Sequence, residues 1–360
     1  MRIVHVISGL RMGGAEAMVA RLVDRLDAEE FASEVVSLTT LGIVGQRMRE
    51  RGIEVREIGF GSAMRAPAAL LRLVRILRER PVDVVQTWLY HADLIGGLAA
   101  RLATRAAVLW NIRHSDFAPE SRRRPAVVSA GARLSRWLPD RIVSCSAAAA
   151  RLHAEMGYAA ERMVVIPNGF DLGRFQPDPR ARAALRAEVG LPEDAPVVGA
   201  VGRHHPQKDH RTFLRAAALV RRARPDVRFL LCGPRLERGN AELEAELAEA
   251  EIGDRCVLLG RRTDVERIDA ALDVACSSSA WGEGFSNVIG EAMACEVPCV
   301  VTDVGDAAEI VGETGRVVPR RDPQAMAAAI LGILDMPARE RRKLGAAARA
   351  RIAARYSLES

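Results

Sequence analysis

The chain has 360 residues, carries a formal net charge of +6, and is 49% hydrophobic and 27% charged. This length suffices for two domains of about 150–180 residues each, and the composition excludes a disordered or fibrous protein. No apolar run reaches the roughly 18 residues that span a bilayer, and the first residues form a strand pattern rather than a secretory signal, so we expect a cytoplasmic protein.

The basic excess lies in the first half of the chain. Residues 1–170 hold 24 Arg against 17 acidic side chains, a net charge of +7, whereas the remaining residues hold 28 basic against 29 acidic ones. This excess fits either a solvated Arg-rich surface or attraction to an anionic membrane leaflet or a phosphate-bearing acceptor. Nucleic acid is not an expected partner, because the three Tyr and eight Phe are too few to interleave with the basic residues.

The six cysteines are scattered and include no C-x-x-C pair. This spacing predicts neither a zinc site nor a redox pair, and it favours reduced, buried thiols in a cytosolic protein.

Short Val- and Ile-rich runs alternate with amphipathic helical patterns along the whole chain. The strands predicted in the first half are Ile3–Ser8, Glu34–Leu38, Val82–Thr87, Ala107–Ile112, Arg141–Ser144 and Met163–Ile166. Those predicted in the second half are Val197–Val201, Arg228–Cys232, Cys256–Leu259, Val274–Ser277, Cys299–Thr302 and Arg316–Val318. Apolar strands separated by helices indicate parallel sheets covered on both faces. Two such series predict an α/β protein with two Rossmann-like domains.

Pro167, Asn168 and Gly169 interrupt regular structure and indicate the domain boundary, with helix Pro179–Val189 leading into the second domain. Open parallel sheets bind ligands at the carboxyl ends of their strands, so two sheets facing each other would hold a ligand in the cleft between them. In the first domain, Arg65–Arg80 is predicted to be a helix with a Leu-rich face and an Arg-rich edge. It fits a crossover helix covering its sheet, and contact with a membrane surface is the alternative.

Three loops carry residues suited to binding or chemistry. The first, Ser8–Glu16, places Gly13 and Gly14 before a helix, where free backbone N–H groups suit a phosphate. Its spacing is not the G-x-G-x-x-G of dinucleotide-binding proteins, and a tight turn without a ligand is the alternative.

The second loop, Gly202–Asp209, directly follows a predicted strand. Arg203 and Lys208 are suited to bind a diphosphate there, one as a fork and the other as a point charge. The adjacent histidines, His204 and His205, are not expected to bind a metal, because no third ligand lies nearby in the sequence.

The third loop runs from Ser279 into a helix and contains Glu283 and Glu291, eight residues apart. Ser286 or Asn287 is expected to cap the helix, whose dipole favours an anion at its start. Eight helical steps would separate the carboxylates by about 12 Å, too far for the acid–base pair of a glycoside hydrolase. We therefore predict that the two carboxylates bind separate hydroxyl-bearing parts of one long ligand.

Together these motifs resemble the family 4 glycosyltransferases of GT-B fold. The resemblance covers nearly the whole chain, because the motifs fall in the family's order: Gly13-Gly14-Ala15-Glu16, Thr87-Trp88…His91-Ala92-Asp93, Ile112-Arg113-His114-Ser115, Ile166-Pro167-Asn168-Gly169-Phe170-Asp171, Gly202-Arg203…Lys208-Asp209, Glu283–Glu291 and Thr302-Asp303-Val304-Gly305-Asp306. It implies two Rossmann-like domains facing across a cleft, residues 1–170 on the acceptor side and residues 171–345 on the donor side. It also implies a C-terminal helix, residues 346–360, packing back toward the first domain.

The resemblance also implies roles for particular residues. The donor diphosphate would be bound by Gly14, Arg203, Lys208, Gly284, Phe285, Ser286 and Asn287. His114 and Glu283 would lie beside the donor sugar as catalytic residues, and Glu291 would bind the ribose. Gly233 and Arg262 would flank the base.

The implied reaction is transfer of a sugar, with retention of anomeric configuration, from a nucleoside-diphosphate donor to a saccharide or lipid-linked acceptor. Positive side chains and the helix start would stabilise the leaving diphosphate, so no metal and no cofactor is expected. The family pattern is similar to that of bacterial enzymes of surface-polysaccharide or glycolipid synthesis, which adds peripheral contact with the anionic inner-membrane surface as an expectation.

One departure and two alternatives accompany this resemblance. Glu296 stands where the family usually has a Gly that ends a helix in left-handed conformation, which would cost about 1 kcal/mol. A sugar-nucleotide 2-epimerase would share the fold, and a non-catalytic sugar-nucleotide-binding protein would share part of the site.

Overall fold

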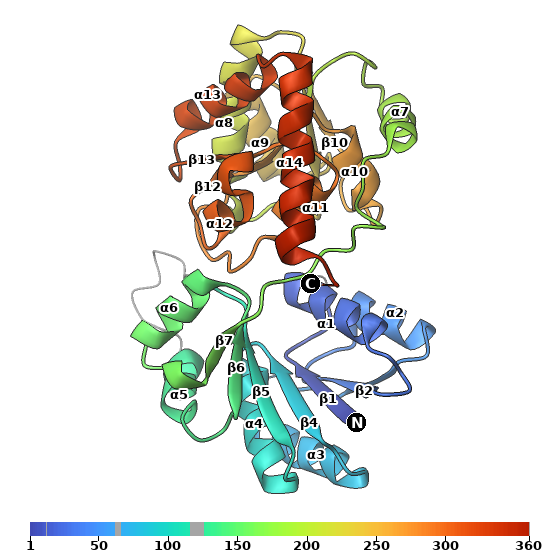
Figure 1. The fold of residues 1–360 in the computed structure, drawn as a ribbon, viewed down its shortest axis with the longest axis vertical. Coiled ribbons are helices and arrows are strands. Elements are labelled where there is room, and N and C mark those ends of the chain that lie inside the picture. The colour runs from blue at the N-terminus through green and yellow to red at the C-terminus, as the bar shows by residue number, and fades with distance from the viewer. Residues whose placement is uncertain (12, 62–65, 116–125, 360) are drawn as a thin grey trace. The chain divides into compact units, whose positions relative to one another are not determined.

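The computed structural model describes residues 1–11, 13–61, 66–115 and 126–359. The chain forms two compact units that divide between Pro167 and Asn168, three residues before the predicted boundary. Each unit is a parallel sheet with covering helices, of seven strands in the first unit and six in the second (Figure 1). The predicted fold class, an α/β protein with two Rossmann-like domains, is confirmed.

The first unit has the strand order β3-β2-β1-β4-β5-β6-β7. Its strands are β1 (Arg2–Ile7), β2 (Ala32–Ser37), β3 (Glu54–Glu57), β4 (Val84–Trp88), β5 (Ala107–Ile112), β6 (Arg141–Ser144) and β7 (Met163–Val165). Six of them coincide closely with the predicted strands. All neighbouring strands are parallel, so their carboxyl ends share one edge of the sheet.

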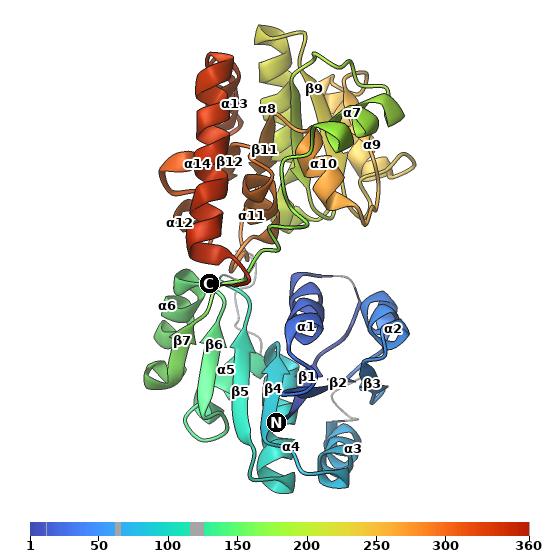
Figure 2. The same ribbon diagram turned by 45° about the vertical axis from the view of Figure 1, so that its right-hand side comes forward.

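Strands β2 and β3 are added on one side of β1, whereas β4 to β7 are added on its other side. This change of direction places the helices on two faces of the sheet. The helices are α1 (Gly14–Arg25), α2 (Gly42–Glu50), α3 (Ala66–Glu79), α4 (Tyr90–Ala103), α5 (Ala126–Leu134) and α6 (Ala147–Glu155). Because crossovers between parallel strands are right-handed, α1 and α2 cover one face, whereas α3, α4 and α5 cover the other (Figures 1 and 2). Helix α3 is thus the predicted crossover helix; Arg65 lies outside the described residues.

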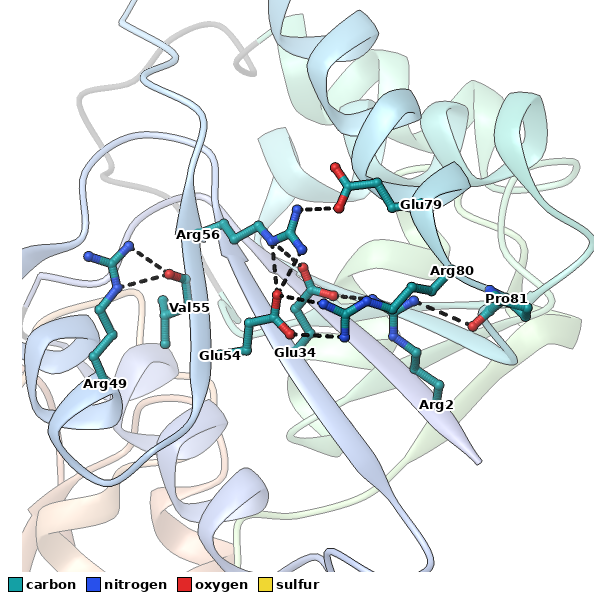
Figure 3. Close-up of polar contacts among 9 residues, drawn as sticks. All are labelled: Arg2, Glu34, Arg49, Glu54, Val55, Arg56, Glu79, Arg80 and Pro81. Atoms are coloured by element: carbon teal, nitrogen blue, oxygen red, sulfur yellow. Dashed lines mark hydrogen bonds and ion pairs between the residues drawn. The ribbon is translucent and has the colours of Figure 1, made fainter.

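An ion-pair network joins the three strands at one end of this sheet (Figure 3). The Glu34 carboxylate, only 2% exposed, accepts from Arg2 of β1 and forms an ion pair with Arg56 of β3, whose Nε lies 2.9 Å from Glu34 Oε1. Arg56 also pairs with Glu54 at 2.7 Å and with Glu79 of α3 at 2.6 Å. The network therefore attaches the edge strand β3 to its neighbours and to a helix.

Glu34→Gln is expected to lower the free energy of unfolding by about 2–3 kcal/mol, because it leaves two partly buried guanidinium groups without their shared carboxylate. Urea unfolding followed by circular dichroism would measure the change. The exposed Glu50 on α2 gives the matched control, Glu50→Gln. Equal midpoints for the two variants would show that the network does not stabilise the sheet.

The second unit has the strand order β10-β9-β8-β11-β12-β13. Its strands are β8 (Val197–Val201), β9 (Arg228–Cys232), β10 (Cys256–Leu258), β11 (Val274–Ser277), β12 (Cys299–Thr302) and β13 (Arg316–Val318). Its helices are α7 (Pro179–Glu188), α8 (His210–Ala223), α9 (Ala241–Ala250), α10 (Val265–Ala271), α11 (Asn287–Ala294), α12 (Ala307–Val311), α13 (Pro323–Leu334) and α14 (Ala338–Tyr356). The core lies between the sheet and these helices, with Phe213, Phe229 and Ile330 fully buried.

The last helix, α14, belongs to the second unit and packs against α11. Gly345 makes this approach close, because a Cβ on it would lie 2.1 Å from the Glu296 carbonyl oxygen. After the helix, the chain pairs with Phe170: the Phe170 N–H donates to the Tyr356 carbonyl at 2.8 Å, and the Leu358 N–H donates to the Phe170 carbonyl at 3.2 Å. The return of residues 346–360 toward the first unit stays a prediction.

Glu296 adopts the left-handed conformation expected of it, with φ of 62°. Glu296→Gly is therefore expected to raise the free energy of unfolding by about 1 kcal/mol, since glycine adopts this conformation without steric cost. The same change at Glu340, within α14, should destabilise through lost helix propensity. Thermal unfolding of both variants tests the sign, and a lower melting temperature for Glu296→Gly would contradict the prediction.

Candidate active site

Two loops of the second unit meet at the carboxyl ends of β8 and β11. Lys208, from the first loop, places its Nζ 2.6 Å from Oε1 of Glu283, from the second. The Ser279 hydroxyl donates to the same oxygen at 3.0 Å. Both charged side chains are largely buried, with 19% of Lys208 and 13% of Glu283 exposed. Lys208, predicted to bind the diphosphate, and Glu283, predicted to bind the sugar, thus form an ion pair with each other.

Hydrogen bonds hold the two loops against each other. The Ser278 hydroxyl donates to the Lys208 carbonyl at 2.8 Å, and the Ala280 N–H donates to the Gln207 carbonyl at 2.8 Å. Gln207 also accepts from the exposed Arg203 guanidinium at 3.1 Å. Gln207, which the sequence did not single out, therefore contacts the Arg203 side chain and also joins the two loops through its carbonyl group.

His204 is a structural residue of this loop. It is buried, and its Nε2 lies 3.0 Å from a Glu246 carboxylate oxygen on α9. Among the described residues, no group of three or more His, Cys, Asp or Glu could hold a metal ion. His204 thus anchors the loop to α9.

Two glycines allow backbones to approach closely around this ion pair. A Cβ on Gly305, where φ is 60°, would lie 2.0 Å from the Glu283 carbonyl oxygen, and a Cβ on Gly233 would lie 1.8 Å from that of Gly202. Larger residues would displace the loops that carry Glu283 and Arg203. Gly233 therefore shapes the site from the predicted base-flanking position.

Helix α11 begins beside Glu283. Ser286 occupies the N-cap position, as predicted, but its side chain makes no capping bond. Its buried Oγ has no hydrogen-bond partner among the described residues. The side-chain amide oxygen Oδ1 of Asn287 accepts from the Asn168 side-chain amide at 2.8 Å. An unsatisfied hydroxyl at a helix start is suited to receive an anionic ligand.

The Phe285 side chain supports this helix start from behind. Its ring stacks on Phe170 with centroids 6.0 Å apart and meets the Tyr356 ring edge-on at 5.3 Å. A Cβ on Gly290 would collide with Phe170 at 2.1 Å. The Phe285 ring is thus engaged in packing, which leaves the backbone of Phe285 for the predicted diphosphate contact.

Glu291 lies within α11 with 6% of its surface exposed. Asp269 of α10 is also buried, and burial, followed by the charges of Glu291 and Glu266, raises its pKa well above the usual range. Burial therefore favours the neutral form of the Asp269 carboxyl.

Arg262 is engaged with acidic side chains. Its guanidinium forms two bonds to Asp264, at 2.9 and 2.7 Å, and one to Glu188 at 2.6 Å. Its role beside the base stays a prediction, and the guanidinium is already neutralised by these partners.

The first unit carries the other two predicted site residues at the carboxyl edge of its sheet. Gly14 is the first residue of α1, and His114 follows β5. The His114 ring stacks on Tyr90, with centroids 6.0 Å apart. The Tyr90 hydroxyl lies 2.9 Å from Nε2 of His153, whose Nδ1 is 2.8 Å from the Ala149 carbonyl.

These contacts determine which ring nitrogen of His153 carries a proton and which one accepts a hydrogen bond. A carbonyl only accepts, so Nδ1 of His153 carries the proton, and burial lowers the pKa of His153 to about 4. Nε2 then accepts from the Tyr90 hydroxyl. Tyr90 and His153 were not singled out in the sequence. They lie on α4 and α6, far apart in the sequence, and only the fold brings them together.

The same edge contains a buried carboxyl group, Asp93. It accepts from the Thr87 hydroxyl at 2.6 Å, and burial raises the pKa of Asp93 to about 8. The pKa of Asp93 is higher in the folded than in the unfolded chain, so its protonated form contributes to the free energy of unfolding. This contribution is complete below about pH 4 and is lost as the pH rises through 8.

Asp93→Asn removes this ionisation and keeps an oxygen for Thr87. Relative to the parent chain, the variant should therefore gain stability by up to about 1.4 kcal/mol for each pH unit between pH 5 and 8. Urea unfolding across this range measures the slope. The exposed Asp194 provides the control, Asp194→Asn, and a pH-independent difference for Asp93→Asn would refute the prediction.

The protein-family model described as Glycosyltransferase Family 4 matches residues 12–174 of the sequence. A second family model, described as Glycosyl transferases group 1, matches residues 195–336. The 2-deoxystreptamine glucosyltransferase of Streptomyces kanamyceticus is 30% identical over 331 residues, covering 87% of this chain and 82% of that protein. The Escherichia coli enzyme named UDP-Gal:alpha-D-GlcNAc-diphosphoundecaprenol alpha-1,3-galactosyltransferase is 29% identical over 251 residues, covering 66% of this chain and 62% of the enzyme.

Among solved structures, Anabaena Alr3699/HepE in complex with UDP-glucose is similar in fold, with a TM-score of 0.86 at 23% identity over 99% of this chain and 96% of that one. The fold is thus that of the GT-B proteins, and the chain is a glycosyltransferase. More specifically, it belongs to glycosyltransferase family 4. The predicted family and enzyme class are confirmed, and the epimerase and non-catalytic alternatives gain no support.

Proposed function

We propose that this glycosyltransferase moves a sugar from a nucleoside-diphosphate donor to a saccharide or lipid-linked acceptor, with retention of configuration and without a metal. The observation that carries the proposal is the Lys208–Glu283 ion pair beside the start of α11. It combines a cation for the diphosphate with a carboxylate for the sugar hydroxyls. We propose that this activity takes part in the synthesis of surface polysaccharide or glycolipid.

In the proposed reaction, the bond between the anomeric carbon and the diphosphate oxygen breaks while the acceptor oxygen bonds to the same carbon. The acceptor proton passes to the departing diphosphate, which leaves from the face that the acceptor enters. Lys208, Arg203 and the backbone at residues 284–287 would stabilise the developing negative charge. Glu283 would hold the sugar, and Glu291 the ribose.

Gly14 and His114 are proposed to contact the donor from the first unit, at the phosphate and the sugar respectively. The stacked Tyr90 ring supports a fixed orientation of the His114 imidazole. Gly233 and Arg262 are proposed beside the base.

The compared proteins suggest which substrates to test first. HepE is described in complex with UDP-glucose, and the E. coli relative is named for a UDP-galactose donor and a diphosphoundecaprenol-linked acceptor. We propose a uridine-diphosphate sugar as donor, and peripheral contact with the cytoplasmic membrane where a lipid-linked acceptor would reside. No helix among the described residues is long and apolar enough to cross a membrane.

Incubation with a panel of sugar nucleotides, with and without excess chelator, tests the proposal. Slow release of nucleoside diphosphate without acceptor, unchanged by the chelator, is the expected result. Loss of activity in chelator that Mn²⁺ restores would refute metal independence. Conversion of the sugar nucleotide to its epimer without diphosphate release would refute transfer, and an inverted anomeric signal in the product's NMR spectrum would refute retention.

A further inference from the structure

Three ring side chains from different segments meet at the carboxyl edge of the first sheet. His114 follows β5, Tyr90 begins α4, and His153 lies on α6. The Tyr90 ring stacks on His114, with the ring planes inclined by 24° and the centroids 6.0 Å apart. The planes of Tyr90 and His153 are inclined by 25°, with centroids 5.8 Å apart. We refer to His114, Tyr90 and His153 as the ring cluster.

His153 is the fixed end of the ring cluster. It is fully buried, its Nδ1 donates to the Ala149 carbonyl at 2.8 Å, and its Nε2 accepts from the Tyr90 hydroxyl at 2.9 Å. The Tyr158 ring meets it edge-on, with centroids 5.0 Å apart. Burial above all, and also the charge of His114, lowers the pKa of His153 to about 4, so this acceptor persists at neutral pH. His153 thus holds Tyr90, which in turn contacts the half-buried His114.

The backbone just before Tyr90 is strained. Leu89 has φ of 74°, a conformation that residues other than glycine rarely adopt. Two hydrogen bonds maintain it, since the Leu89 N–H donates to the Asn111 carbonyl at 3.3 Å and the Leu89 carbonyl accepts from the Asp93 N–H at 2.9 Å. Strain of this kind persists where surrounding contacts enforce it, and it is concentrated at functional sites. The enforced turn places Tyr90 against the segment that carries His114.

The contacts within the ring cluster favour positioning over proton relay. A relay would need a continuous chain of hydrogen bonds from His114 to His153. Tyr90 has a single hydroxyl proton, which it donates to His153, and it meets His114 through its ring. Because offset-stacked rings prefer a defined geometry, this contact restricts the rotation of the His114 imidazole.

We propose that Tyr90 and His153 are positioning residues, which hold the His114 imidazole in one orientation beside the donor sugar. The inference rests on the proposed function, which places His114 at that sugar, and it deepens it by naming the groups that orient the imidazole. Misorientation of a group at the reacting centre raises the barrier to transfer more than it weakens substrate binding. The effect is therefore expected in kcat rather than in KM.

Substitutions of the Tyr90 ring test the stack. Tyr90→Leu is expected to lower kcat for diphosphate release by about 10- to 100-fold, while KM for the sugar nucleotide changes by less than about twofold. Tyr90→Phe keeps the stacked ring and should remain within about tenfold of the parent chain. Tyr158→Phe is the matched control, because it also removes a buried phenol hydroxyl beside His153 but leaves the ring cluster intact. Its kcat should equal that of the parent.

Paired substitutions test the hydrogen bond between Tyr90 and His153. His153→Leu alone leaves the Tyr90 hydroxyl without this acceptor, and Tyr90→Phe alone leaves Nε2 of His153 without this donor. The double variant removes both polar groups and keeps the ring that stacks on His114. It should therefore recover kcat by at least about threefold over His153→Leu. Equal kcat in these two variants would show that the bond does not position His114.

The strained turn is tested by two substitutions of Leu89. Leu89→Gly and Leu89→Ala both remove the side chain, but only glycine adopts a φ of 74° without steric cost. Leu89→Gly should therefore be the more stable of the two in urea unfolding and still have the lower kcat, because the freed turn no longer fixes Tyr90. A lower kcat for Leu89→Ala would contradict this role of the turn.

Proton NMR of the histidine rings supplies a readout that needs no activity, with the His114 signals assigned by their loss in His114→Gln. Tyr90→Leu should change the chemical shifts of the His114 ring protons, whereas Tyr90→Phe should largely preserve them. Unchanged kcat in a Tyr90→Leu chain whose His114 signals have moved would overturn positioning alone. If the parent chain released no diphosphate from any sugar nucleotide, the proposed function would fail, and the catalytic role of the ring cluster with it.

Discussion

Lys208→Met is expected to lower kcat/KM for the sugar nucleotide by about 10²- to 10³-fold. The substitution keeps the length and apolar stem of the side chain and removes the cation proposed to meet the departing diphosphate. A group that stabilises charge in the transition state contributes about 3–4 kcal/mol to catalysis, which corresponds to that loss. Steady-state kinetics of diphosphate release measure it directly, and most of the loss should appear in kcat.

Lys343, the other lysine of the chain, provides the control for this change. It is exposed on α14 and pairs with Glu340 at 3.1 Å. Lys343→Met should leave kcat/KM unchanged. If Lys208→Met raised KM alone, Lys208 would bind the ground state and transition state equally, and its proposed catalytic role would be wrong.

Glu283→Gln is expected to separate nucleotide binding from catalysis. In the ion pair, the Glu283 carboxylate lies 2.6 Å from Lys208, where it competes with an incoming phosphate for the ammonium group. A neutral amide ends this competition. The affinity for bare nucleoside diphosphate should rise by up to about fivefold, which corresponds to about 1 kcal/mol for the ion pair that is lost. Transfer should fall at least about 10²-fold, because the sugar loses its charged hydrogen-bond acceptor.

Glu291→Gln is the matched comparison, since it makes the same chemical change about one helix turn inside α11 rather than in the ion pair. Its proposed role at the ribose predicts weaker binding of bare nucleoside diphosphate. Calorimetric titration of both variants would thus give affinity changes of opposite sign. Weaker nucleotide binding by Glu283→Gln would contradict the competition between Glu283 and phosphate for Lys208.

Most strands were predictable because buried parallel strands are continuous apolar runs. β3 was missed for a physical reason: its sequence Glu54-Val55-Arg56-Glu57 holds a single apolar residue, and it lies at the sheet edge. Its polar side chains are explained by the ion pairs of Arg56 with Glu34 and Glu79, on segments distant in the sequence. Such pairings depend on tertiary structure and leave no local periodicity.

The candidate site was predictable as a set of loops but not as a set of contacts. Strand–loop–helix order places Arg203, Lys208 and Glu283 at the carboxyl edge of one sheet, which is why their loops could be named. The direct bond between Lys208 and Glu283 required the fold. Asp269 was not predicted at all, because a lone carboxylate in a charged helical segment ordinarily faces solvent, whereas here it is buried.

The pairing of Phe170 with residues 356–358 brings the first and last segments of the second unit together. The first and last segments of the second unit therefore lie side by side, joined by these hydrogen bonds. New termini could be opened in an exposed turn and the old ones joined by a short peptide, with little loss of packing. The unit is thereby suited to circular permutation and to exchange as a cassette between related enzymes.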